Sequence, residues 1–380
     1  LEMHEGGAFA KAINKFAFKI FNGAVAIKLY RSLVLPKEAR DTYILDKKSL
    51  VFFRPDWSAP LEAFPKEIPE DMPELILQIG SGLYGVRDEK GDFDPERYKK
   101  VMRFCRMTEI KISQGAKQTG GKIAGVKVTD DISYYRGVPA GEDLISPNRF
   151  PYAHDVEELM DFIGTLQELS EKPVGMKIVI SDRDDIDKLL KRLAQRKEEG
   201  KAIPSYIAVD SGEGGSATAP LELMESIGLD AINSVYVLDT LLRKHDIRDD
   251  IKIVSSGKYL TPDDVVVGLS IGADMIAIAR GFMMSAGCIR ARVCNGMGGH
   301  ICPVGLATQD KKRRASFLVF QKSHHVSYYH DNLVNGIKNL LAVMGKKNVD
   351  ALCKENLTYK EESGEIYFNV DKYFHHKLHV

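Results

Sequence analysis

The amino-acid sequence predicts an α/β protein, a (β/α)8 barrel of the TIM type. Three observations support this prediction. Between residues 74 and 310, short apolar runs alternate with amphipathic helical stretches. The apolar runs are rich in Ile and Val and show little two-residue alternation, as strands buried on both faces of a parallel sheet do. A glycine-containing loop follows nearly every run, where a barrel places its functional loops. A doubly wound sheet is the less favoured alternative.

Six runs are expected to be strands, and they cover residues 75–80, 107–112, 174–179, 206–209, 251–255 and 275–279. Apolar side chains at helical spacing predict helices at 156–169, 186–197, 235–244 and 262–271. Thr261 and Pro262 suit the N-cap and the first position of the last helix. Six strands are too few to close an eight-stranded barrel. We therefore expect the first strand or strands to lie upstream of Leu1 or within the first 70 residues.

The chain is expected to have three regions. Residues 1–73 form an N-terminal segment with an amphipathic helix and a proline-rich connector at 54–73. That helix carries one apolar and one lysine stripe, and we interpret it as packing on its own barrel rather than on a membrane or a partner. Residues 74–345 form the barrel, and residues 346–380 a polar C-terminal tail. The tail's three histidines are interpreted as an exposed cluster rather than a metal site: His375, His376 and His379.

Composition excludes several classes of protein. Apolar residues make up 44% of the chain, enough for a sizeable core and too many for a disordered protein. Lys+Arg and Asp+Glu both number 53, so bulk charge argues against a nucleic-acid-binding or membrane-surface protein. No apolar run is long enough to span a bilayer, and no signal-peptide pattern is visible. Five cysteines, three of them within residues 288–302, predict a cytoplasmic ligand cluster rather than a disulfide framework.

Glycines mark the ends of three predicted strands. The segment from Asp210 to Ser216 contains Gly212, Gly214 and Gly215, which would let backbone N–H groups approach a ligand closely. A tight surface turn is the alternative interpretation.

The next two strands end in Ser256-Gly257 and Arg280-Gly281. In barrels of this type the loops after the last two strands commonly bind a phosphate, with glycine amides and an arginine as donors. The alternative is that Arg280 pairs with an acidic neighbour.

Three polar residues lie at or just after the end of the second predicted strand: Lys111, Gln114 and Lys117. Lys111 lies within an apolar strand, and Lys177 repeats the situation in another. A lysine in such a strand must point into the barrel mouth or be buried at a cost of several kcal/mol. Two converging lysines predict an anionic ligand, although a lysine paired with a barrel acid is a reasonable alternative for either one.

Cys288, Cys294 and Cys302 have the spacing C-x5-C-x7-C, and Pro303 follows the third. The paired C-x2-C spacing typical of zinc sites is absent. Three thiolates better suit an iron–sulfur cluster that lacks one protein ligand. The alternative is that these are incidental buried cysteines.

These pieces together resemble the FMN-binding synthase domain of glutamate synthases, in particular the stand-alone form without an amidotransferase domain. The resemblance covers roughly residues 74–345. It rests on long segments in the same order as in the family: Gln78 to Gly82, Phe93 to Arg97, Glu109 to Lys117, Ile145 to Pro147, Asp210 to Pro220, Ser256 to Lys258, and Cys302 to Asp310.

The resemblance implies an oxidoreductase acting on CH–NH2 donors, with FMN in the barrel and a [3Fe–4S] cluster on Cys288, Cys294 and Cys302. Electrons from ferredoxin or a pyridine-nucleotide reductase subunit would reduce 2-iminoglutarate, made from 2-oxoglutarate and ammonia, to L-glutamate. An amidotransferase subunit is one source of the ammonia, and the chain is expected to belong to an oligomer or complex.

Residue roles follow from the same resemblance. The family's 2-oxoglutarate contacts match Lys111, Gln114, Lys117 and Arg136, and its flavin-facing lysine matches Lys177. The FMN-binding positions match the strand-end residues Asp210, Gly212, Gly214, Gly215, Ser256, Gly257, Arg280 and Gly281. Residues 3–7 resemble a family loop after the second strand, which would bring Glu5 into the substrate site.

The sequence departs from the family pattern in several places. The last two cysteines are separated by seven residues instead of four, the loop after Lys117 is one residue shorter, and Ser211 replaces a glycine. Two other functions therefore stay open. One is a related FMN oxidoreductase acting on another imine, such as an N-methylglutamate synthase subunit. The other is a non-catalytic electron-transfer or scaffold barrel in a multi-subunit complex.

Overall fold

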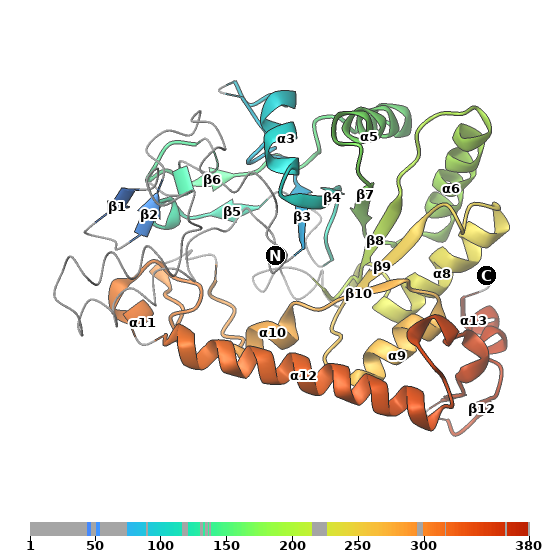
Figure 1. Ribbon diagram of the computed structural model, residues 1–380. Helices are drawn as coiled ribbons and strands as arrows, with labels where there is room; N and C mark the ends of the chain where they lie inside the picture. The colour runs from blue at the N-terminus through green and yellow to red at the C-terminus, as the bar shows by residue number, and fades with distance from the viewer. Residues whose placement is uncertain are drawn as a thin grey trace. The chain divides into compact units, whose positions relative to one another are not determined.

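The computed structural model describes most of the chain beyond residue 73. The described residues are 44–46, 51–53, 74–88, 90–115, 121–129, 132–133, 136, 138–214, 226–294, 299–315, 317–361 and 363–378. Figure 1 labels the helices and strands of the described residues. The chain divides into two compact units. Unit 1 comprises residues 1–108, 120–147 and 286–325, and unit 2 comprises residues 109–119, 148–285 and 326–380.

All six predicted strands are confirmed, and they form one sheet in the order β10-β9-β8-β7-β4-β3. Their bounds are β3 Leu75–Ile79, β4 Cys105–Lys111, β7 Val174–Ile178, β8 Tyr206–Asp210, β9 Lys252–Ser256 and β10 Met275–Ala277. The pairs β7–β8, β8–β9 and β9–β10 are parallel. Strands that follow one another along the chain are neighbours, which is the winding of a barrel, whereas a doubly wound sheet reverses its order. Within the described residues the sheet is an open half-barrel.

Four predicted helices of unit 2 are also confirmed: α5 Val156–Ser170, α6 Arg183–Glu198, α8 Ala231–Lys244 and α9 Pro262–Ile271. Each begins at a residue suited to capping. Asp155, Asp182 and Asp230 accept hydrogen bonds from backbone N–H groups of the first turn. Asp264 accepts from the N–H of Thr261, in a capping box. After β7 and β9 the next helix, α6 or α9, therefore begins within six residues of the last residue of the strand.

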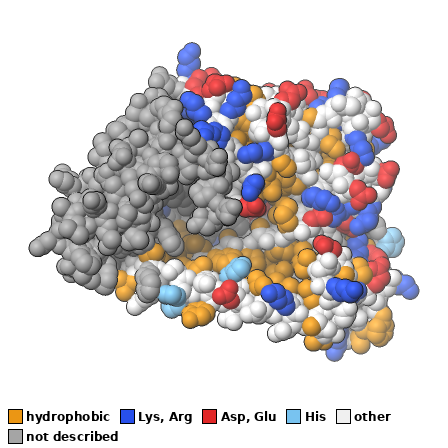
Figure 2. All heavy atoms as spheres, in the orientation of Figure 1, with side chains coloured by type: hydrophobic (Ala, Val, Ile, Leu, Met, Phe, Trp, Pro, Cys, Tyr) orange, Lys and Arg blue, Asp and Glu red, His pale blue; other side chains and the backbone are white. Residues whose placement is uncertain are grey.

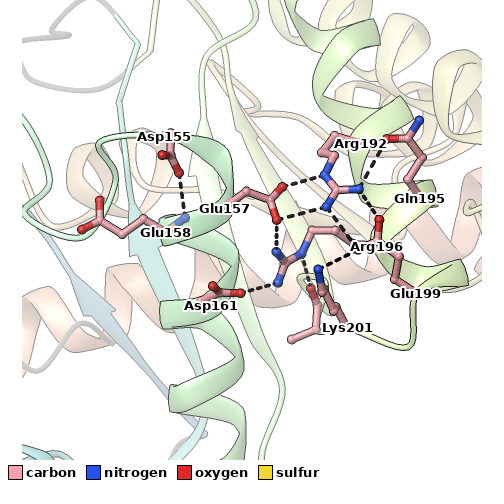
Figure 3. Close-up of polar contacts among 10 residues, drawn as sticks. Asp155, Glu157, Glu158, Asp161, Arg192, Gln195, Arg196, Glu199 and Lys201 are labelled. Atoms are coloured by element: carbon pink, nitrogen blue, oxygen red, sulfur yellow. Dashed lines mark hydrogen bonds and ion pairs between the residues drawn. The ribbon is translucent and has the colours of Figure 1, made fainter.

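An ion-pair network joins α5 to α6 (Figure 3). Glu157 of α5 accepts hydrogen bonds from Arg192 at 2.6 Å and from Arg196 at 2.6 Å, both of α6. Arg196 is only 1% exposed and also reaches Asp161 at 2.7 Å. Arg192 extends the network to Glu199. Because a buried guanidinium must be paired, Arg196 fixes the register of the two helices.

The C-terminal region contains several short helices and strands. After α12 (Val319–Val343) come two 3-10 turns, η6 (Val349–Ala351) and η7 (Lys354–Asn356), a β11–β12 pair (Tyr359–Lys360 and Ile366–Tyr367) and α13 (Val370–Leu378). Phe374 of α13 stacks on Tyr236 of α8 with ring centroids 4.2 Å apart. Lys354 pairs with the fully buried Asp239 of α8 at 3.0 Å. His375 and His376 are exposed, as expected; His379 lies outside the described residues.

Unit 1 contains β3 and most of β4, joined by α3 (Pro95–Met102). It also holds two antiparallel pairs, β1–β2 (Ile44–Asp46 and Val51–Phe53) and β5–β6 (Lys122–Ile123 and Leu144–Ile145). A 3-10 turn, η4 (Gly125–Lys127), follows β5. Residues 286–325 complete this unit, including all three clustered cysteines and the short helix α11 (Lys311–Ala315).

Surface charge agrees with the neutral composition. On the face shown in Figure 2, Lys, Arg, Asp and Glu side chains are interspersed over the helices of unit 2, and hydrophobic side chains gather near α12. None of the helices in the described ranges combines the length and apolar character needed to cross a bilayer.

Candidate functional site

Asp210, the last residue of β8, joins three strand ends of unit 2. Its carboxylate accepts a hydrogen bond from the N–H of Gly115, after β4, at 2.9 Å. It accepts a second from the hydroxyl of Ser256, the last residue of β9, at 3.0 Å. Asp210 is 4% exposed, and burial raises the pKa of its carboxyl group, against the lowering effect of these hydrogen bonds and of Lys177. The ends of β4, β8 and β9 therefore meet around this carboxylate.

The glycines after these strands are required by close backbone approaches. A Cβ at Gly212 would lie 2.3 Å from the carbonyl oxygen of Ile227, and one at Gly214 would lie 2.7 Å from the Asp210 carboxylate. Gly257 has a φ of +152°, and a Cβ there would lie 2.1 Å from the Ser211 hydroxyl. Loops this tight can bring several backbone amides to one point.

Ser211 is the site's unsatisfied group. The residue is fully buried, and its hydroxyl has no hydrogen-bond partner among the described residues. Its own N–H donates to the carbonyl of Ser256 at 2.8 Å, which holds it between the ends of β8 and β9. A buried hydroxyl left unpaired costs about 1–3 kcal/mol, so a ligand that accepts its hydrogen bond would be stabilised here.

Lys177, on β7, forms an ion pair with Glu109 of β4 at 3.1 Å. Both side chains are more than four-fifths buried, at 17% and 12% exposed. This is the strand lysine paired with a barrel acid, the alternative considered for it from the sequence. Its charge still reaches the strand ends, because it lowers the pKa of Asp210. Lys111 ends β4 and is half-buried.

The remaining predicted residues of unit 2 lie close to these strand ends in the sequence. Gln114 is half-buried and precedes Gly115. Arg280 is half-buried and begins α10 (Arg280–Ser285), the helix that follows β10. Gly281 has a packing reason to be glycine, because a Cβ there would lie 2.0 Å from the hydroxyl of Tyr329 on α12.

Arg136, the predicted substrate contact of unit 1, is 9% exposed. Its guanidinium lies over the ring of Tyr84, 5.2 Å from the centroid, and Arg87 lies over the same ring at 5.9 Å. The Nε atoms of both arginines are buried without an acceptor in the described part of the chain. A buried guanidinium with unused donors favours an anionic ligand.

The three clustered cysteines lie close enough to affect one another. Burial raises the pKa of the Cys294 thiol, and the neighbouring Cys288 and Cys302 raise it further. Lys127 acts in the opposite direction, and its ammonium donates to the Cys294 carbonyl. Among the residues that the structure describes, no three His, Cys, Asp or Glu side chains are arranged around a single metal ion.

Three predicted site residues lie outside the described residues: Glu5, Lys117 and Gly215. The sequence did not predict four residues that make contacts at these sites: Glu109, Ser211, Tyr84 and Lys127. Two had a signal in the sequence. Glu109 is a carboxylate in an apolar strand, and Ser211 departs from the family's glycine. The partners of Tyr84 and Lys127 are distant in sequence, so local pattern could not identify them.

The fold and these strand ends define an α/β protein of the barrel class with a buried polar site at the carboxyl ends of parallel strands. A family model described as the conserved region in glutamate synthase matches residues 61–347. The chain therefore belongs to the glutamate synthase family.

Several known proteins are similar to this chain. The glutamate synthase large subunit-like protein YerD of Bacillus subtilis (strain 168) is 38% identical over 304 residues, which cover 80% of this chain and 56% of that protein. An archaeal-type glutamate synthase [NADPH] of Thermotoga maritima is 31% identical, over 76% of this chain and 53% of its own length. The chain spans about half the length of these relatives. Among solved structures, a mutant flavocytochrome b2 with benzoylformate matches 76% of this chain and 55% of its own, with a TM-score of 0.42 and 12% identity.

Proposed function

We propose that this chain is an FMN- and iron–sulfur-dependent glutamate synthase subunit. It would reduce 2-iminoglutarate, formed from 2-oxoglutarate and ammonia, to L-glutamate. The observation on which this rests is the buried strand-end site of unit 2. There Asp210 joins the ends of β4, β8 and β9, beside a Ser211 hydroxyl that lacks a protein partner.

These strand ends fit FMN. The orphaned Ser211 hydroxyl and the Gly257 backbone, where a Cβ could not be accommodated, suit the close approach of a phosphate. Arg280, at the following strand end, would add a bidentate cation, with Gly212, Gly214, Gly215 and Gly281 shaping the loops. When bound, FMN would supply the hydride chemistry. The Lys177–Glu109 pair would keep a cation fixed beside it.

The proposed substrate residues fit a dicarboxylate. Lys111 ends β4, and Gln114 and Lys117 follow it in the sequence. Arg136 has a buried guanidinium with an unused Nε donor. Cations and amides of this kind bind carboxylate oxygens by charge-assisted hydrogen bonds. Their task would be to orient the imine carbon and to exclude water, and Glu5 is proposed to join them.

The cysteines fit an iron–sulfur cluster by the chemistry of their donors. Cys288, Cys294 and Cys302 are free thiols that influence one another electrostatically. A [3Fe–4S] cluster would take one thiolate on each of three irons. Free thiols and such a cluster favour a cytoplasmic location.

The electron donor is proposed from the relatives. The Thermotoga maritima relative is named for NADPH, and a relative in Pyropia yezoensis, 28% identical over 74% of this chain and 17% of its own length, is named a ferredoxin-dependent glutamate synthase. We therefore propose ferredoxin or a pyridine-nucleotide reductase subunit as donor, with an amidotransferase partner or free ammonia as nitrogen source.

The proposal is tested on the full chain, purified without air. Visible absorption and EPR spectra report the flavin and the cluster, and 2-oxoglutarate is then offered with ammonia or with methylamine and a chemically reduced ferredoxin. We expect one FMN per chain, an EPR signal from the oxidised cluster, and L-glutamate formed only with ammonia.

Other outcomes would contradict the proposal. N-methylglutamate formed from methylamine in preference to glutamate would identify the related imine reductase. Bound FMN without turnover of either amine would identify an electron-transfer or scaffold subunit. A colourless preparation that stays colourless after incubation with FMN would remove the basis of all three functions.

A further inference from the structure

Lys127 contacts the segment that carries the three clustered cysteines, residues 288–307, here called the cysteine segment. Its ammonium donates to the carbonyl of Cys294 at 2.5 Å and lies 3.4 Å from the carbonyl of Ala307. These acceptors are 167 and 180 residues away in sequence. One precedes Cys302 and the other follows it, so a single side chain holds the backbone on both sides of the third cysteine.

The backbone that carries Lys127 is held in place by hydrogen bonds and close packing. It ends the 3-10 turn η4, whose first N–H, that of Gly125, donates to the Asp143 carboxylate at 2.7 Å. A Cβ at Gly125 would lie 2.2 Å from the carbonyl oxygen of Gly141, so the turn packs directly on the 138–143 loop. Val128 is 2% exposed, and its carbonyl accepts from Gly141 at 2.9 Å. The ammonium is therefore presented from a rigid element.

The segment that Lys127 holds has its own constraints near the third cysteine. Cys302 is 7% exposed, and its carbonyl accepts from the N–H of Gly305 at 3.3 Å. Gly305 has a φ of +76°, and a Cβ there would lie 2.2 Å from the carbonyl oxygen of Arg313. The turn after Cys302 is thus fixed by packing, and Lys127 adds the link from this turn back to Cys294.

We propose that Lys127 is a positioning residue: by hydrogen bonding to the backbone of the cysteine segment, it holds Cys294 and Cys302 in place as cluster ligands. This inference rests on the proposed function in that a cluster occupies the three thiols. An ammonium has three donors on one atom, which suits two carbonyl oxygens converging on one point. Its charge also offsets the repulsion of gathered thiolates. A methionine would leave both carbonyls without a donor, whereas arginine keeps charge and donors.

The test compares the full wild-type chain with Lys127→Met, with Lys127→Arg, and with Lys122→Met as a matched control. Lys122 is an exposed lysine on the neighbouring strand β5. Iron and sulfide per chain, the EPR line shape and the reduction potential are measured after anaerobic reconstitution. Hydrogen exchange of peptides within residues 286–315 is measured on protein freed of iron.

We expect Lys127→Met to retain less than half of the wild-type iron and to exchange roughly tenfold faster in that region, because two charge-assisted hydrogen bonds are lost. The reduction potential of the remaining cluster should become more negative, since a nearby positive charge favours the reduced form. Lys127→Arg should recover most of the iron and the potential, and Lys122→Met should resemble the wild type.

Two results would overturn the proposal. One is wild-type iron content, potential and exchange in Lys127→Met. The other is faster exchange throughout unit 1, which would make Lys127 a general stabilising residue. The exchange measurement also separates this inference from the proposed function. If the wild type binds no iron, the proposed function fails. Faster hydrogen exchange confined to the cysteine segment in Lys127→Met would still support the positioning role of Lys127.

Discussion

The carboxylate of Asp210 orders three loops. Its two oxygens satisfy the N–H of Gly115 and the hydroxyl of Ser256 while burial raises its pKa. We predict that Asp210→Ala destabilises the chain by about 2–5 kcal/mol, because both donors become buried and unpaired. Asp210→Asn should cost less than about 1 kcal/mol, since its amide can serve both neighbours without a buried charge. Urea unfolding at pH 7 compares the variants; equal losses for both would show that charge, and not hydrogen bonding, holds the loops.

At the scale of elements, the α5–α6 network predicts a dependence on pH. Arg192 and Arg196 hold the pKa of Glu157 at about 2, below its ordinary value of 4.5, and Arg192 and Lys201 hold that of Glu199 at about 2. A lowered carboxyl pKa contributes stability that is present above pH 4.5 and is lost as the pH falls towards 2. Glu157→Gln should therefore flatten the loss of stability between pH 4.5 and 2, as measured by urea midpoints. An unchanged slope would show that the pair is fully screened by solvent.

The docking of α13 on α8 gives a second prediction for elements. Phe374 is 3% exposed and stacks on Tyr236, so Phe374→Ala should cost about 3–5 kcal/mol or release the C-terminal region. The nearby His376 is exposed, and His376→Ala should stay within about 0.5 kcal/mol. Thermal unfolding and limited proteolysis report the two effects. Equal, small effects would mean that α13 adds nothing to the stability of unit 2.

The elements also show what the sequence could predict. Ile- and Val-rich runs identified all six strands of the sheet, because burial on both faces leaves a local signature. The sequence predicts only a polar C-terminal tail, because the aromatic residues of this region are scattered among charges. Only tertiary packing brings Tyr359 and Tyr367 onto Tyr373. Likewise the apolar pattern around Lys177 predicted a lysine that points into the barrel mouth or is buried. Which carboxylate faces it depends on strand order, and so Glu109 was missed.

At the scale of the whole molecule, the residues proposed to hold the flavin and the cluster lie in different units. Unit 1 holds the cysteine segment and Arg136, and unit 2 holds the strand-end site around Asp210. If both proposed cofactors bind, damage to one site should leave the cofactor of the other in place. Gly257→Ala tests this, because it introduces a Cβ 2.1 Å from the Ser211 hydroxyl at a φ of +152°. Gly200→Ala is a matched control, since Gly200 has a φ of +68° with open space around it.

We predict that Gly257→Ala lowers the FMN content at least fivefold, because an L residue at this φ costs about 1–3 kcal/mol before the steric conflict is added. Its iron content should equal that of the wild type. Gly200→Ala carries backbone strain alone and should keep both cofactors, with only a lower unfolding midpoint. The FMN content is measured from flavin absorbance after denaturation, and the iron content by iron analysis. Joint loss of FMN and iron in Gly257→Ala, with both retained in Gly200→Ala, would show that the two units fold around their cofactors as one cooperative structure.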